Sequence, residues 1–177
     1  LTQEDMGVYA LLSITLTLVQ IVSALSLPAA SIKYVAQYLA EGNREKAKSV
    51  VTRVLQIGLA TSTVALILLF ISAEWLSTII SGTTANAPLL RLLAFASFFV
   101  ILYSQISGFL QGIQKMGTMA LISGGYASLQ SVVGIYLILS GWGLVGVVSS
   151  WLVGFAFAFA VGLTFTLKHL GASQRSH

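Results

Sequence analysis

The stretch from Met116 to Leu167, with the sequence MGTMALISGGYASLQSVVGIYLILSGWGLVGVVSSWLVGFAFAFAVGLTFTL, contains no charged residue. It is too long for a single helix across a bilayer, because about 20 apolar residues are enough for one span. The tetrapeptide Ser140-Gly141-Trp142-Gly143 divides it, since two glycines beside a tryptophan of the interfacial kind are typical of a turn. We therefore predict two membrane-spanning helices here, over about 117–139 and 143–167.

Three more uncharged runs precede this stretch, and they predict spans over about 7–32, 54–73 and 90–112. The composition agrees, with 56% hydrophobic and 8% charged residues and a mean hydropathy of +0.92. A soluble domain carries about 25% charged residues, so most of this surface must face lipid. The sequence predicts an all-α, polytopic transmembrane helix bundle of about five spans, forming a single domain over residues 1–177.

Two features are expected to shape the first half of the chain. Pro28 lies late in the first run, where a proline removes one backbone donor and is expected to kink the helix. Gly42 and Asn43 suit the end of one helix and the N-cap of the next.

Basic residues gather on one side of the predicted topology. If the spans alternate, one side receives Lys33, Arg44, Lys46, Lys48, Arg53, Lys115, Lys168 and Arg175. Only Arg91 falls on the other side, so the positive-inside rule makes the crowded side cytoplasmic. We expect a protein of the cytoplasmic membrane whose chain begins outside and ends inside. Because it begins at Leu1 with no signal peptide, a preceding span is expected to be missing.

Chemistry-bearing residues are scarce inside the predicted spans. There is no cysteine, and His169 and His177, near the C-terminus, do not form a metal site. The five acids lie at the edges of spans, and they are Glu4, Asp5, Glu41, Glu45 and Glu74. A membrane-embedded hydrolase or transferase needs carboxylates, His or Cys. We therefore predict no enzyme, with no catalytic residue, metal or cofactor. The net charge of +4 is too small for a nucleic-acid binder.

Four segments carry a family resemblance. They are Leu1–Ala10 (LTQEDMGVYA), Leu25–Ala36 (LSLPAASIKYVA), Glu41–Ala47 (EGNREKA) and Ser107–Gln114 (SGFLQGIQ). In this order they resemble polysaccharide biosynthesis proteins, the flippases of the multidrug/oligosaccharidyl-lipid/polysaccharide exporter superfamily. Two positions depart from the family's pattern, because Ser26 stands where glycine is usual and Lys33 where arginine is common.

The resemblance implies a transporter of twelve to fourteen spans in two lobes, of which this chain would supply the second to sixth spans of the N-terminal lobe. It implies that a lipid-linked oligosaccharide or polysaccharide precursor crosses the membrane by alternating access. The partners would be membrane lipids, the lipid-linked glycan and the remainder of the same chain. One alternative is a multidrug exporter of the same superfamily. Another is a membrane-integral glycan polymerase or glycosyltransferase.

Five residues are candidates for substrate binding under this resemblance. Lys33 could hold the diphosphate of a polyprenyl-linked glycan, or it could extend to lipid headgroups as an ordinary interfacial lysine. Arg53 could contact the cavity. Gln20, Gln105 and Gln130 lie inside predicted spans and should face protein or water, because an unpaired amide in hydrocarbon is costly. They could bind sugar hydroxyls or join neighbouring helices.

Overall fold

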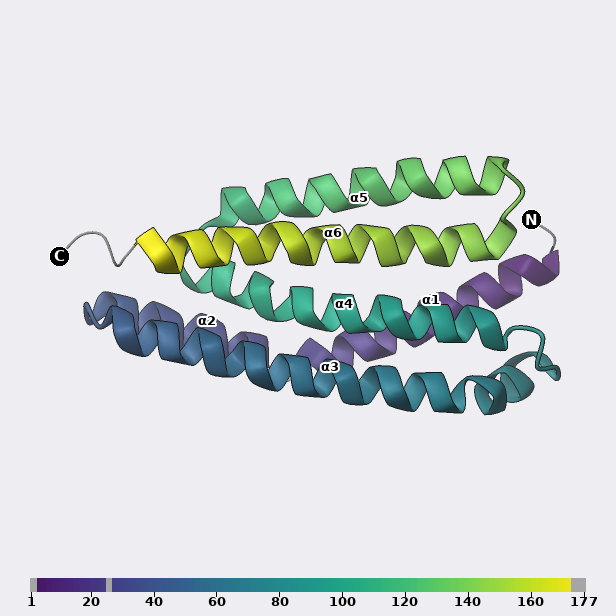
Figure 1. The fold of residues 1–177 in the computed structure, drawn as a ribbon, viewed down its shortest axis with the longest axis horizontal. Helices are drawn as coiled ribbons and strands as arrows, with labels where there is room; N and C mark the ends of the chain where they lie inside the picture. The colour runs from purple at the N-terminus through teal and green to yellow at the C-terminus, as the bar shows by residue number, and fades with distance from the viewer. Residues whose placement is uncertain (1–2, 25–26, 173–177) are drawn as a thin grey trace.

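The computed structural model describes residues 3–24 and 27–172, which are almost entirely helical and contain no strand. The bounds are α1 (Gln3–Ala24), α2 (Leu27–Ala40), α3 (Arg44–Ser81), α4 (Ala87–Gly112), α5 (Met116–Leu139) and α6 (Gly143–Ala172). The long helices run side by side in alternating directions (Figure 1). The prediction of an all-α, polytopic bundle is therefore confirmed.

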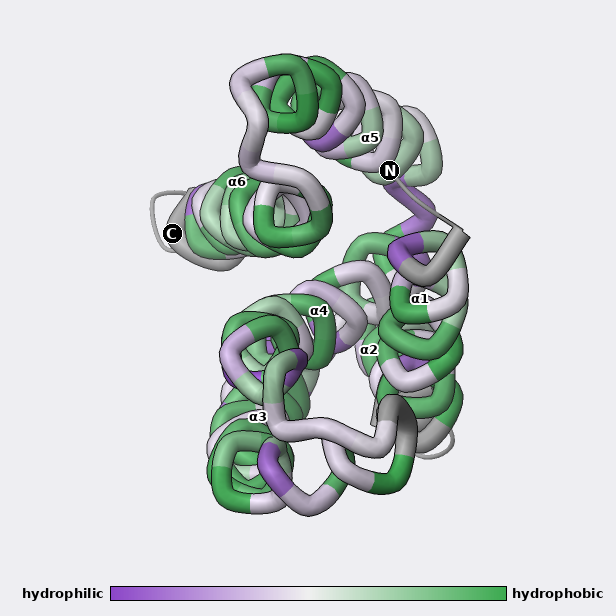
Figure 2. Tube along the Cα trace, turned by 90° about the vertical axis from the view of Figure 1, so that its right-hand side faces the viewer, coloured by the Kyte–Doolittle hydropathy of each residue, from purple (hydrophilic) through white to green (hydrophobic). Residues whose placement is uncertain are grey.

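Helix α4 is the centre of the bundle. It packs against α1, α2, α3 and α6, whereas α5 packs mainly against α6. Seen along the helices, α4 lies between α3 on one side and α6 on the other, with α5 beyond α6 (Figure 2). Helix α4 contributes more buried apolar residues than any other helix, and its Leu93, Ala94, Ala96 and Ile106 are fully buried. The helices α3 and α6 thus depend on α4 to hold them in register.

Glycines mark the positions where neighbouring helices approach most closely. A methyl group on Gly58 would lie 2.7 Å from Cγ of Gln105, and one on Gly162 would lie 2.7 Å from Cγ2 of Ile106. A methyl group on Gly112 would lie 3.2 Å from the carbonyl oxygen of Ile32. Small residues let transmembrane helices pack at short range, so these glycines set the spacing of α3, α6 and α2 around α4.

The first predicted span is covered by two described segments, α1 (Gln3–Ala24) and α2 (Leu27–Ala40). Pro28 lies at the start of the described part of α2. Residues 25–26, directly before it, lie outside the described part of the chain, so the kink at Pro28 stays a prediction.

Three connections contain a glycine with positive φ, whereas the α4–α5 connection has Gln114 at φ of +58°. Gly42 has φ of +72° after α2, and the side chain of Asn43 accepts a hydrogen bond from the Lys46 amide at 3.1 Å. Both features were predicted from the sequence. Gly82 ends α3 with φ of +69°, and Gly141 has φ of +86° in the turn between α5 and α6. A positive φ is readily adopted by glycine alone, so these turns depend on that residue type.

Within residues 3–24 and 27–172, four helices are long and apolar enough to cross a membrane. They are Arg44–Ile79, Ala87–Gly112, Met116–Leu139 and Gly143–Lys168. The apolar part of α1, Asp5–Ile21, is shorter, so the fifth span stays a prediction. Helix α3 extends well beyond the expected 54–73, because its first turns are amphipathic and continue the same helix from Arg44.

Candidate functional site

Most charged side chains lie at one end of the bundle. Figure 1 shows the α2–α3 connection, the α4–α5 connection and the end of α6 at the same end, which we name the basic end. The basic residues of these elements are Lys33, Arg44, Lys46, Lys48, Arg53, Lys115 and Lys168. Glu41 and Glu45 are the acids there, and Arg91 lies in the first turns of α4 at the opposite end. Which end faces the cytoplasm stays a prediction.

A row of cations and aromatic rings follows α2 into the start of α3. Nζ of Lys33 lies 5.8 Å from the ring centroid of Tyr34, whose ring stacks on that of Tyr38 with 6.5 Å between centroids. Nζ of Lys46, from the first turn of α3, lies 5.8 Å from the Tyr38 centroid. A cation within about 6 Å of a ring face is attracted by the ring's quadrupole. We name Lys33, Tyr34, Tyr38 and Lys46 the cation–aromatic row.

The row is accessible from outside the bundle. Lys33 and Tyr34 are exposed and Tyr38 is half-buried, while Val35 on the same helix is fully buried. Nε2 of Gln37 donates a hydrogen bond to Glu41 at 2.9 Å, which fixes the neighbouring turn. Helix α2 therefore holds its inner face against α4 and presents two rings and a cation outward.

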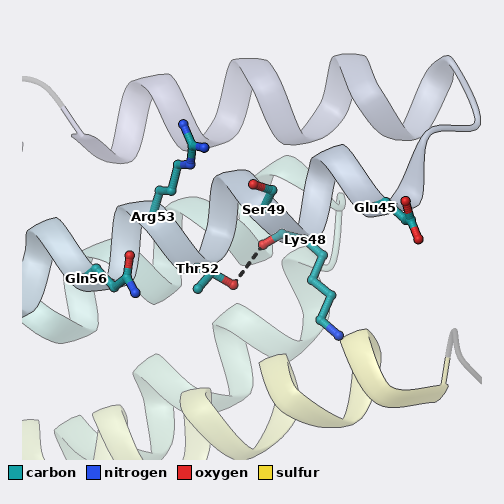
Figure 3. A pocket seen from close by; sticks show the side chains of 6 residues that line it. All are labelled: Glu45, Lys48, Ser49, Thr52, Arg53 and Gln56. Atoms are coloured by element: carbon teal, nitrogen blue, oxygen red, sulfur yellow. Dashed lines mark hydrogen bonds between the residues drawn. The ribbon is translucent and has the colours of Figure 1, made fainter.

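A second polar surface lies on α3, where a shallow hollow of about 460 Å³ opens outward. Its lining comes from α3 alone and consists of Glu45, Lys48, Ser49, Thr52, Arg53 and Gln56. Arg53 extends to the side on which α2 lies, and Lys48 to the side of α6 (Figure 3). The hydroxyl of Thr52 donates to the carbonyl oxygen of Lys48 at 3.0 Å. We name this surface the α3 hollow.

The three glutamines occupy different environments. Gln105 is 2% exposed between α3 and α4, and its Oε1 has no hydrogen-bond partner within the described part of the chain. Gln130 is half-buried on α5, and its Oε1 would be 3.4 Å from a methyl group placed on Gly154 of α6. Both therefore face neighbouring helices, as predicted. Gln20 is exposed on α1.

The five predicted site residues do not converge on one point. Lys33 and Arg53 share the basic end, on α2 and α3, whereas Gln105 and Gln130 lie at two separate helix–helix contacts. The tyrosines of the cation–aromatic row were not among the predicted site residues, and neither were the residues of the α3 hollow other than Arg53. The hollow had a readable signal, because Lys48, Thr52 and Gln56 recur every four residues and so share one helix face.

A metal centre has no basis in the described residues, which contain no group of three or more His, Cys, Asp or Glu side chains able to hold an ion. The basic end instead offers ammonium, guanidinium, hydroxyl and amide groups. Such groups bind anions through charge-assisted hydrogen bonds. The chemistry available at this end is therefore the binding of a phosphate or a carboxylate.

The sequence of this apolar helix bundle matches a known protein family. A sequence model described as polysaccharide biosynthesis protein matches residues 1–177. The chain belongs to the polysaccharide biosynthesis protein family. Neither the comparison with curated proteins nor that with solved structures gave a match. The family assignment and the multi-pass helical fold agree that this is a membrane protein of polysaccharide biosynthesis.

Proposed function

We propose that this polysaccharide biosynthesis protein is a flippase, which moves a lipid-linked oligosaccharide or polysaccharide precursor across the cytoplasmic membrane. Family membership and the polytopic helical bundle support the proposal. The observation that carries it is the cation–aromatic row on α2, where an exposed ammonium group stands beside an exposed ring at the basic end. Such a pair suits a substrate that combines a charged diphosphate with a sugar.

Lys33 is the anchor in this proposal. A diphosphate carries more than one negative charge, and an exposed ammonium group can bind it through charge-assisted hydrogen bonds. The Nζ of Lys33 is held near the Tyr34 ring at 5.8 Å, so the ammonium group is oriented before the substrate arrives. Pre-positioning of this kind reduces the entropy lost on binding.

Transport then proceeds by alternating access. In this mechanism the bundle acts as one of two lobes that rock around a central site. Gly58, Gly112 and Gly162 allow α3, α2 and α6 to pack tightly on α4, so the bundle can move as a rigid unit. Substrate enters at the basic end, which we place on the cytoplasmic side because cytoplasmic loops carry an excess of Lys and Arg.

A reconstitution assay tests this function. The purified full-length protein is placed in liposomes that contain a lipid-linked oligosaccharide with a fluorescent sugar, and a membrane-impermeant reagent reports which leaflet holds the sugar. We expect protein-dependent transfer between leaflets, with no change in the glycan's length. Movement of a cationic dye without movement of the glycan would instead indicate a multidrug exporter. Elongation or cleavage of the glycan would indicate an enzyme.

A further inference from the structure

The outward face of α3 changes character along its length. From Glu45 to Gln56 the exposed positions are those of the polar α3 hollow. Beyond it, as far as Ala73, the exposed large residues are apolar, namely Ile57, Leu59, Val64, Ile67, Leu68, Phe70 and Ile71. The stretch from Ile57 to Ala73, which ends before the exposed Glu74, covers about 24 Å at 1.5 Å per residue, most of the ~30 Å thickness of a bilayer's hydrocarbon core. On this helix, hydrocarbon therefore begins just beyond Gln56.

Helix α6 becomes polar closer to the basic end. Gly58 of α3 contacts Gln105, and Gly162 of α6 contacts the next residue, Ile106, so both glycines lie at the same depth on α4. Beyond Gly162, α6 still exposes Phe165 and Leu167 before Lys168. Counted from the two glycines at 1.5 Å per residue, Gln56 of α3 lies about 3 Å and Arg53 about 7.5 Å toward the basic end, whereas Lys168 of α6 lies about 9 Å toward it.

The deepest polar group of the hollow is the Gln56 amide, and an unpaired amide among lipid tails is costly unless a polar partner reaches it. Lys48 and Arg53 lie at the two edges of the hollow, and Gln56 lies at its deep end with amide donors. The Thr52 hydroxyl already donates to its own helix. Two cations and the one carboxylate of Glu45 leave a net charge of +1, which matches the single negative charge of a phosphodiester.

We propose that the α3 hollow binds the headgroup phosphate of an anionic membrane phospholipid, whose acyl chains lie along the apolar face of α3. The match of a polar hollow to a headgroup, and of the following apolar face to the tails, supports a phospholipid. The site is separate from the cation–aromatic row, and its occupancy does not depend on the proposed flippase activity. A diphosphate carrier is a poorer fit, because Glu45 opposes a second negative charge.

Native mass spectrometry of the purified full-length protein tests the proposal. The probe is phosphatidylglycerol, with phosphatidylcholine and a polyprenyl diphosphate as comparisons. The variant Lys48→Gln/Arg53→Gln removes the two cations of the hollow. The matched control is Lys115→Gln/Lys168→Gln, which removes the same charge from the same end on other helices. The variant Gln56→Leu removes the deep amide with no change of charge.

We expect the Lys48/Arg53 variant to retain phosphatidylglycerol at least about tenfold less well than the parent, since each charge-assisted hydrogen bond to the phosphate contributes about tenfold. Gln56→Leu should lower retention about threefold, and the Lys115/Lys168 control should stay within about twofold. Equal losses in the control and the Lys48/Arg53 variant would overturn the proposal in favour of diffuse attraction. Preferential retention of the polyprenyl diphosphate would overturn it in favour of a substrate site. If the Lys48/Arg53 variant fails to fold, normal retention by Gln56→Leu is the overturning result.

Discussion

Gly58 of α3 and Gln105 of α4 form a very close contact at the centre of the bundle: a methyl group on Gly58 would lie 2.7 Å from Cγ of Gln105. The contact pairs the residue without a side chain with a fully buried amide, whose Oε1 has no hydrogen-bond partner in the described helices. Close approach of the two backbones thus comes with an unsatisfied polar atom. The close packing of the two helices stabilises the protein, whereas the unsatisfied oxygen destabilises it. Substitutions at Gly58 and at Gln105 can measure the two effects separately.

The first prediction is that Gly58→Ala destabilises the protein by about 1–3 kcal/mol, because an added methyl group overpacks a contact that has no space. This loss outweighs the gain of up to ~1 kcal/mol that alanine normally brings to a helix. The measurement is the midpoint of chemical unfolding in detergent. Gly124→Ala on α5 is the control, since no atom lies within 4 Å of its added methyl. Equal stability of the Gly58 variant and the control would contradict the tight contact.

The second prediction concerns the amide itself. Gln105→Met keeps the length of the side chain and removes the buried Oε1, so we expect the protein to gain about 1 kcal/mol of stability, the cost of an unsatisfied buried polar group. Glycan transport should be unchanged, because Gln105 is enclosed between two helices. A fall in transport with unchanged protein level would show that Gln105 contacts substrate in another conformation.

The third prediction concerns the end opposite the basic end. Nη2 of Arg91 lies 2.6 Å from Oε1 of Glu74, with side chains 40% and 65% exposed, and its guanidinium carbon lies 5.4 Å from the Phe70 ring centroid. Exposed ion pairs contribute about 0–1 kcal/mol. Glu74→Gln should therefore lower the free energy of unfolding by less than ~1 kcal/mol, and this difference from the parent should disappear in high salt. Arg91→Ala should lower the free energy of unfolding by more than Glu74→Gln does. Part of this loss should remain in high salt, because the packing of Arg91 on Phe70 is also lost.

The fold was readable from the sequence because its main signals are local. The length of uncharged runs, the glycine turn at Gly141 and the cap at Asn43 each depend on a few neighbouring residues. The path of the chain at Pro28 stays a prediction, since a proline can kink a helix or begin one with the same sequence signal.

The candidate site was less readable because it depends on which way each helix faces. Lys33 and Arg53 could be named from their charge. The cation–aromatic row could not, because it forms only when α3 places Lys46 beside Tyr38 of α2. Gln105 and Gln130 look alike in sequence as amides in apolar runs. Only the positions of Gly58 and Gly154 on neighbouring helices show that both amides lie at packing contacts.

The fourth prediction concerns topology. The chain has no cysteine, so single cysteines can be introduced and labelled in cells with a membrane-impermeant reagent. Cysteines at Asn43 and Lys115, in the connections of the basic end, should be labelled only after the membrane is opened. Cysteines at Thr83 and Gly141, in the opposite connections, should be labelled from outside. Labelling of Thr83 only after opening would reverse the orientation, and the proposed cytoplasmic entry with it.

The last prediction returns to Lys33 and the function. In the full-length protein, Lys33→Ala should lower glycan export about tenfold at unchanged protein level, the size expected for losing one charge-assisted hydrogen bond. Lys33→Arg should retain most of the export, because the positive charge beside Tyr34 is kept. The matched controls Arg44→Ala and Lys48→Ala remove one positive charge from the same end and should export almost normally. If Lys33→Ala also exports normally, Lys33 serves only as an interfacial lysine reaching for headgroups, and the diphosphate is held by another part of the protein.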